Sequence, residues 1–316
     1  MEFDLALDHV DFDRYRSPPE KASTAVTPAA EKPGEGSNDP LKTLEMNGTF
    51  ALGSATFAGL RVTDGHVKLQ ARGGLAHIAP LTARLYGGQY SGDVALDARG
   101  PVLSSRFAQT LAGVDVAQLL KDFAKSQRLS GRGTITSTLM AHGSDADAVL
   151  KSLNGHVAAN LANGAIEGID LGFEINRAMA LLRKQAAPSG TSTGRTRFET
   201  FRASADIVAG TATTKDLEVA SQNLRVTGQG TANLVTEAID YRVQAKVLKA
   251  ASVGAGAAGS PGTLADIPLS ITGTMSSPAV RPDLEGLAKS QVQQEFNKHK
   301  QDLQQKLQDQ LKNLLR

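Results

Sequence analysis

The chain is dominated by short runs in which apolar and polar residues alternate. Alternation with a period of two gives a β-strand one apolar face and one polar face. The pattern is clearest over residues 239–247, and it recurs between residues 44 and 111 and over 131–142, 155–161 and 267–271. It predicts a mainly β protein built on a long antiparallel sheet with one continuous apolar face.

Three short segments between these runs carry residues that adopt the positive φ of tight hairpin turns. They are Asp64-Gly65, Gly87-Gly88 and Asn163-Gly164. We therefore expect a hairpin at each of the three positions.

A few interposed segments change to helical spacing. Residues 116–123 have an apolar stripe behind Asp115, a good N-cap, and residues 144–147 open a second short helix. Residues 170–186 form a longer amphipathic segment. After Pro282 the chain is predicted to be an amphipathic C-terminal helix with one narrow stripe of Leu303, Leu307, Leu311 and Leu314.

Composition divides the chain into four parts. Residues 1–16 alternate like a strand and are interpreted as the remnant of a truncated N-terminal part, and residues 17–40 are rich in Pro, Ala, Gly and Ser, as in a flexible linker. Residues 41–281 form the β-rich domain, and residues 282–316 form the C-terminal helix. That helix is expected to dock on a partner, on a membrane surface or at the groove mouth; the alternative is a solvent-exposed tail.

Candidate chemistry is scarce. The net charge is only +2, cysteine and tryptophan are absent, and the aromatic share is 4%. Residues 254–259 match G-x-G-x-x-G, but Ser260-Pro261-Gly262 follows instead of a helix, so we interpret them as a loop. The six histidines show no metal-binding spacing. We expect no enzymatic activity, no cofactor, no metal and no nucleic-acid partner. No run of 18 apolar residues predicts a membrane-spanning helix.

Five segments resemble, in the same order, the C-terminal domain of the AsmA family. They are residues 85–92 (LYGGQYSG), 111–116 (LAGVDV), 150–155 (LKSLNG), 163–170 (NGAIEGID) and 273–283 (GTMSSPAVRPD). The resemblance spans roughly residues 44–285. It implies a periplasmic protein associated with the inner membrane of a Gram-negative bacterium. It also implies an elongated, curved antiparallel sheet that forms an open groove, similar to that of bridge-like lipid-transfer proteins. The same resemblance implies a role in envelope integrity, outer-membrane biogenesis and phospholipid movement. The family's N-terminal membrane helix has no counterpart in this sequence, so the anchor is expected to be absent from it.

The residue pattern and the resemblance agree on a lipid-binding groove. A diacyl phospholipid has about 30 methylenes, each worth about 0.8 kcal/mol when hidden from water. We expect the apolar sheet face to bind or conduct phospholipid between the inner and outer membranes. The residues on the apolar phase of their strands are the groove candidates: Val67, Leu69, Leu81, Leu85, Tyr90, Val94, Leu96, Ile135, Leu139, Val157, Leu161, Ile239, Tyr241, Val243, Leu269 and Ile271.

Another interpretation treats the protein as a structural or assembly-assisting module for outer-membrane proteins that acts through protein contacts. In that case the apolar face is an ordinary core, covered by the helices at residues 115–125 and 170–186. The C-terminal helix would then bind inner- or outer-membrane proteins. A membrane-spanning barrel is disfavoured because helices interrupt the run of strands.

Overall fold

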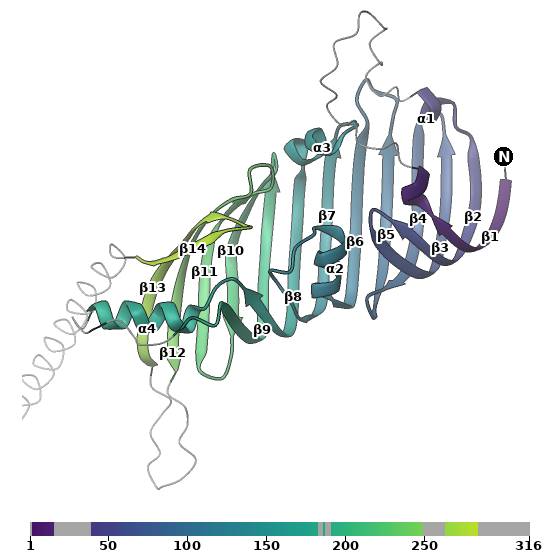
Figure 1. Cartoon of the computed structure of the whole chain (residues 1–316). Coiled ribbons are helices and arrows are strands. Elements are labelled where there is room, and N and C mark those ends of the chain that lie inside the picture. Colours follow the sequence, from purple (N-terminus) through teal and green to yellow (C-terminus); the bar gives the residue numbers. More distant parts are fainter. Residues whose placement is uncertain (1, 16–38, 183–185, 187–190, 249–262, 284–316) are drawn as a thin grey trace, which may run out of the picture.

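The computed structural model describes residues 2–15, 39–182, 186, 191–248 and 263–283. Its strands form a single 14-stranded sheet in which spatial order follows chain order (Figure 1). Neighbouring strands are antiparallel, except that β1 and β2 are parallel. The expected mainly β fold with an open, curved sheet is confirmed.

The strands are β1 (Glu2–Asp11), β2 (Met46–Phe57), β3 (Leu60–Arg72), β4 (Leu75–Leu85), β5 (Gly88–Asp97), β6 (Ser104–Asp115), β7 (Arg132–His142), β8 (Asn154–Glu167), β9 (Arg195–Val208), β10 (Thr211–Ala220), β11 (Leu224–Asn233), β12 (Ala238–Leu248), β13 (Thr263–Thr274) and β14 (Pro278–Pro282).

Five short helical elements accompany the sheet in the described part of the chain. They are the 3-10 helix η1 (Phe12–Tyr15) and the α-helices α1 (Asp39–Thr43), α2 (Val116–Phe123), α3 (Ala146–Ser152) and α4 (Leu171–Leu182). The carboxylates of Asp115 and Asp145 cap α2 and α3 by accepting hydrogen bonds from backbone N–H groups three residues later, as their positions in the sequence predict. The predicted C-terminal helix and most of the predicted linker lie outside the described residues.

Two of the three hairpin predictions are wrong, because the residues lie at bends inside strands and not at turns between them. Only Tyr86-Gly87 forms a turn, between β4 and β5, where both residues have positive φ. Asp64 and Asn163 also have positive φ (51° and 52°), but they lie inside β3 and β8. At Asp64 the pairing of β3 with β4 shifts by one residue, which is a β-bulge. Bulges bend and twist a strand, so the conformation that the sequence indicates serves curvature at these positions rather than chain reversal.

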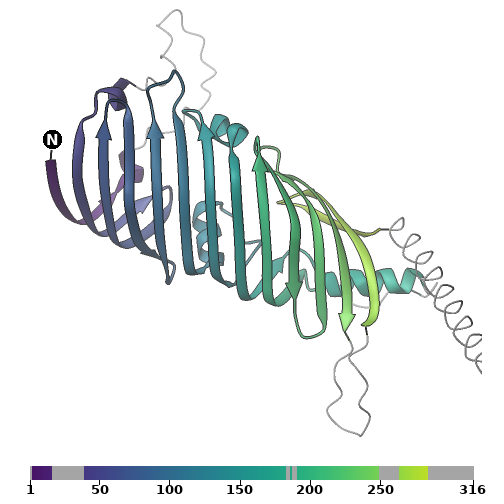
Figure 2. The same ribbon diagram turned by 180° about the vertical axis from the view of Figure 1, so that it is seen from behind.

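The curved sheet encloses α2 and α4 on one side. Figure 1 shows both helices in front of the sheet, and Figure 2, from behind, shows the opposite face free of them. We call the side that carries α2 and α4 the concave face and the other side the outer face. The helix α3 lies at one rim, against the end of β7.

The sheet is closed over its last strands. The apolar residues Leu171, Ile175 and Ala178 of α4 are buried in one cluster with residues of β9–β13. The guanidinium of Arg128, in the loop before β7, donates a hydrogen bond to the carbonyl oxygen of Ser276 in the β13–β14 turn. The β13–β14 hairpin therefore reaches back across the concave face toward the middle of the sheet (Figure 1).

Candidate functional site

The pairing register places all sixteen groove candidates on the concave face. One row across the sheet, for example, joins Leu69, Ile78, Val94, Phe107 and Leu139. Near the other end, Val243 pairs with Leu269 in a row that belongs to the same face. The alternation of each strand is therefore in phase with its neighbours, even though several strands contain bulges. Lipid binding by these residues stays a prediction.

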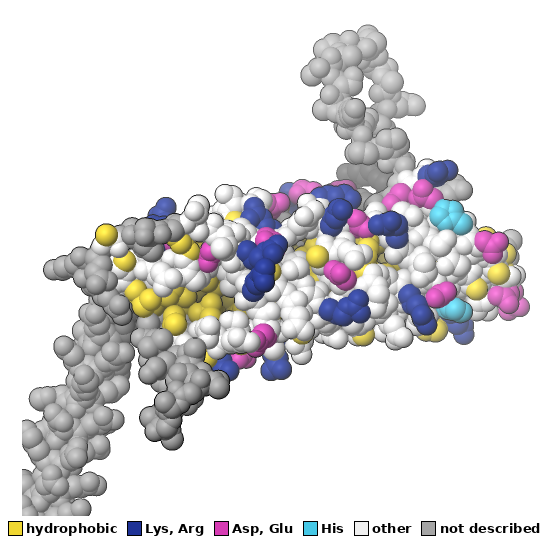
Figure 3. Space-filling model, turned by 60° about the horizontal axis from the view of Figure 1, so that its bottom comes forward, with side chains coloured by type: hydrophobic (Ala, Val, Ile, Leu, Met, Phe, Trp, Pro, Cys, Tyr) yellow, Lys and Arg dark blue, Asp and Glu magenta, His cyan; other side chains and the backbone are white. Residues whose placement is uncertain are grey.

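Charge is segregated between the two faces of the sheet. Every Asp, Glu, Lys or Arg that has a partner in the pairing register lies in a row of the outer face. Some inward polar groups are hydrogen-bonded: the Ser105 hydroxyl donates to the Ala141 carbonyl, and the hydroxyls of Thr214 and Tyr241 are 3.2 Å apart. Gln109 and Ser137 also face inward, in the row that joins Leu81 to Val157. Figure 3 shows charged side chains spread over the surface and apolar side chains gathered mainly at the end formed by the last strands. The concave face is therefore suited to apolar contact along its whole length.

Burial divides this face into two parts. Val243, Leu161 and Leu269 are almost fully buried beneath α4 and the β13–β14 hairpin, in the main hydrophobic cluster. We call the concave face of β9–β14, together with the part of β8 from Leu161 onward, the closed half. Leu85 is also buried, beside α2, and Val94 is buried in its row. Tyr90, Ile135, Tyr241 and Ile271 are partly buried against the main cluster, and Ile239 is half-buried outside it.

The other part is open. Beyond α2, half-buried apolar side chains of β2–β8 line the concave face without belonging to the main cluster. We call this part the open trough, and it contains six of the groove candidates: Val67, Leu69, Leu81, Leu96, Leu139 and Val157.

The trough includes residues of β1 that the sequence analysis did not select. Phe3, Leu5 and Leu7 lie in the same rows as residues of β2 on the concave face, and Leu5 and Leu7 are exposed. The rings of Phe3 and Phe50 have centroids 4.7 Å apart. The alternation of residues 2–8 was enough to predict a strand, but it could not show that the strand pairs in parallel with residues 45 positions further along the chain.

A hydrogen-bond network fixes α2 at the inner end of the trough. The Tyr86 hydroxyl donates to a carboxylate oxygen of Asp122 at 2.7 Å, and the Arg61 guanidinium lies 3.6 Å from the same oxygen. Burial, together with the hydrogen bond to Asp122, raises the pKa of Tyr86 to about 12. The same hydrogen bond lowers the pKa of Asp122. The network joins α2 to β3 and to the β4–β5 turn.

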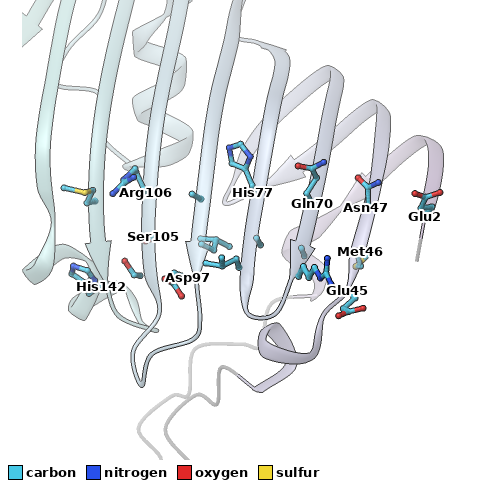
Figure 4. Close-up of a pocket in the computed structure, with 18 residues that line it drawn as sticks. Glu2, Glu45, Met46, Asn47, Gln70, His77, Asp97, Ser105, Arg106 and His142 are labelled. Carbon is cyan, nitrogen blue, oxygen red and sulfur yellow. The ribbon is translucent and has the colours of Figure 1, made fainter.

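The outer face has a separate hollow of about 960 Å³ over the ends of the first seven strands, lined by polar side chains together with Leu75 and Met140. Figure 4 shows Asn47, Gln70, His77 and Arg106 side by side along one row, with Asp97, Ser105 and His142 nearer the strand ends. Sequence reasoning missed this hollow because its residues come one or two from each strand and form no local motif.

The described residues offer little for catalysis or metal binding. Histidines of the outer face pair singly with carboxylates, His77 with Asp93 and His156 with Asp206, each at 2.9 Å. Among the described residues there is no group of three metal-ligating side chains, and none of the helices is both long and apolar enough to cross a membrane.

Comparison with known proteins identifies the family. The family model of the AsmA family matches residues 8–217, and the chain belongs to that family. The chain is 25% identical over 190 residues to Protein AsmA of Escherichia coli (strain K12). That alignment covers 60% of this chain and 31% of the relative, so the chain spans about a third of the relative's length. No solved structure matches the chain.

Proposed function

We propose that this AsmA-family chain contributes to lipid homeostasis of the cell envelope by holding the acyl chains of phospholipid in the open trough. The observation that carries the proposal is the combination of an apolar concave face, whose pairing rows contain no charged residue, with the absence of a covering layer over the described residues of β2–β7 beyond α2. A large apolar surface that remains accessible is characteristic of an interaction site.

The trough fits acyl chains better than it fits a polar ligand. Its aliphatic side chains and three phenylalanines, Phe3, Phe50 and Phe107, provide an extended apolar surface with few inward hydrogen-bonding groups. Each methylene that leaves water contributes about 0.8 kcal/mol, so even a partly covered acyl chain gains several kcal/mol. Recognition of a particular headgroup is not required for this gain.

The remaining parts of the proposal concern location and chemistry. We place the protein in the periplasm, associated with the inner membrane, where phospholipid moves between the inner and outer membranes. We expect it to act by binding, without a catalytic step, a cofactor or a nucleic-acid partner. Contact with inner- or outer-membrane proteins through residues 282–316 is a further part of the proposal.

Site-specific photocrosslinking tests the proposal directly. A photoreactive amino acid at Leu69 faces the trough, whereas the same group at the next residue, Gln70, faces outward. With radiolabelled phospholipid, we expect crosslinking at position 69 and background at position 70. Equal labelling at the two positions would contradict acyl binding on the concave face.

A matched pair of substitutions tests the same face without a probe. Leu69→Asp puts a charge in the trough, and Gln70→Asp makes the same change in charge on the outer face. Native mass spectrometry should show loss of co-purifying lipid only for Leu69→Asp, with the circular dichroism of both variants unchanged. A wild-type protein that carries no lipid would instead favour the assembly module acting through protein contacts.

A further inference from the structure

Three exposed phenylalanines outside the trough lie on elements that contact one another. Phe12, Phe57 and Phe123 have 39%, 56% and 63% of their surface exposed. They lie on η1, at the β2–β3 turn and at the end of α2; η1 contacts β2, and the β2–β3 turn contacts α2. The rings of Phe12 and Phe57 meet edge to face with centroids 6.4 Å apart.

Polar contacts hold the three elements together. The two carboxylate oxygens of Asp13 accept hydrogen bonds from the backbone N–H groups of Ala58 and Gly59, each at 2.7 Å. A Cβ at Gly59 would lie 3.1 Å from the carbonyl oxygen of Asp122, so the turn packs closely against α2. The phenylalanines are therefore presented on a fixed rim and not on separate mobile loops.

Four cationic side chains lie on the same elements as these rings or directly beside them in the chain. The side chains of Arg14 and Arg61 are 83% and 77% exposed, and Lys121 and Lys125 of the α2 region are exposed as well. Carboxylates offset part of this charge: Asp11 lies 3.1 Å from Arg14 and Asp122 lies 3.6 Å from Arg61. Asp13 holds the β2–β3 turn, so the four cations exceed the three carboxylates by one positive charge. We define the aromatic–basic rim as Phe12, Phe57 and Phe123 with Arg14, Arg61, Lys121 and Lys125.

We propose that the aromatic–basic rim docks on the surface of a bilayer that contains anionic lipid. Exposed aromatic side chains insert at the level of the headgroups, and neighbouring Lys and Arg side chains attract anionic headgroups. The phenylalanines project from a turn and a helix end, which suits shallow insertion into a bilayer more than burial in a flat protein interface. The rim lies beside α2, at the inner end of the open trough, yet docking does not require the trough to hold lipid.

Vesicle flotation tests the docking. The full chain is mixed with extruded vesicles of phosphatidylcholine containing phosphatidylglycerol, or of phosphatidylcholine alone. We expect flotation with the anionic vesicles and its loss at high salt, since screening weakens the attraction of the cations. The double variant Phe57→Ser, Phe123→Ser should bind roughly tenfold more weakly.

Two controls make the result specific. Val208 is 66% exposed at the β9–β10 turn, whose Gly210 lies beside the Leu150 carbonyl of α3 at another rim, and Val208→Ser should float like the wild type. Leu69→Asp should also float normally, which separates docking from acyl binding. A wild-type protein that does not float, or a double variant that floats as well as the wild type, overturns the proposal.

Discussion

The closed half and the open trough are built from the same alternating strands, yet they differ in what covers them. In the closed half, α4 and the β13–β14 hairpin bury Val243 and Leu269 in the main cluster. In the open trough, Leu69 and Leu139 occupy equivalent positions on their strands but remain half-buried. The difference shows that an apolar sheet face becomes a core or stays accessible according to the elements that cross it.

The two parts also differ in what they contribute to stability. A side chain such as Val243, once fully buried, contributes about 1.5–3 kcal/mol through the hydrophobic effect. A half-buried side chain of the trough has already lost part of its contact with water, and the remainder of that gain is available to a ligand. The comparison therefore predicts that substitutions in the two parts separate stability from binding.

The largest expected effect follows a charge placed in the closed half. Val243 is 2% exposed, and Val243→Asp would leave an unpaired carboxylate in the core at a cost of about 3–5 kcal/mol. Urea denaturation should show this loss, or the variant should fail to fold. The control Gln244→Asp changes the adjacent residue on the outer face and should stay within about 0.5 kcal/mol of the wild type.

Removing the same group from each half sharpens the comparison. Leu161 is 1% exposed, so Leu161→Ala should lower the free energy of unfolding by about 3 kcal/mol through lost burial and a cavity. Leu139→Ala, in the open trough, should cost only about 1 kcal/mol because its site is already partly open to water. Equal losses in denaturation experiments would mean that the trough is packed as tightly as the closed half.

A smaller effect on the free energy of unfolding should appear at alkaline pH. It arises from Tyr86, which holds α2 at the inner end of the trough. Because the folded pKa of Tyr86 is raised to about 12, its neutral form is favoured in the folded protein. The contribution to stability is complete below about pH 10, the unfolded value, and is lost as the pH rises toward 12. Tyr86→Phe should cost about 1 kcal/mol at pH 8 and remove this pH dependence. Unfolding free energies of both proteins between pH 8 and 12 check the prediction, and an identical slope for the variant would contradict it.

The smallest effect concerns the start of α4 in the closed half. Burial acts to raise the pKa of Asp170, but hydrogen bonds from Thr193, Phe173 and Ser192 outweigh it and leave the pKa below its usual range. Its stabilising contribution is present above the unfolded value near 4 and is lost as the pH falls through the lower folded value. Asp170→Asn should reduce stability by less than about 1 kcal/mol at pH 7, since Asn is also a good N-cap. The difference between the melting curves of the two proteins should narrow as the pH falls below about 4, and a difference that does not narrow would contradict the assignment.

Local patterns predicted much of this architecture because they depend on neighbours in the chain. The alternation of each strand identified the concave-face residues, from Val67 to Ile271, and Asp115 marked the start of α2. The positive φ of Asp64 and Asn163 was also predictable, but its use was not: the same conformation fits a hairpin turn and a bend within a strand. Which of the two forms depends on the strands paired on either side.

The sequence by itself determined the fold class, the apolar phase of each strand and the absence of an evident catalytic motif, because these follow from residue type and spacing. Only the tertiary structure decided which part of the apolar face is covered, since Arg128 and Ser276 are 148 positions apart and meet only when the sheet curls. The same holds for the parallel pairing of β1, the outer hollow and the aromatic–basic rim. Each of these collects residues from several elements, and their proximity arises from the curvature of the whole sheet.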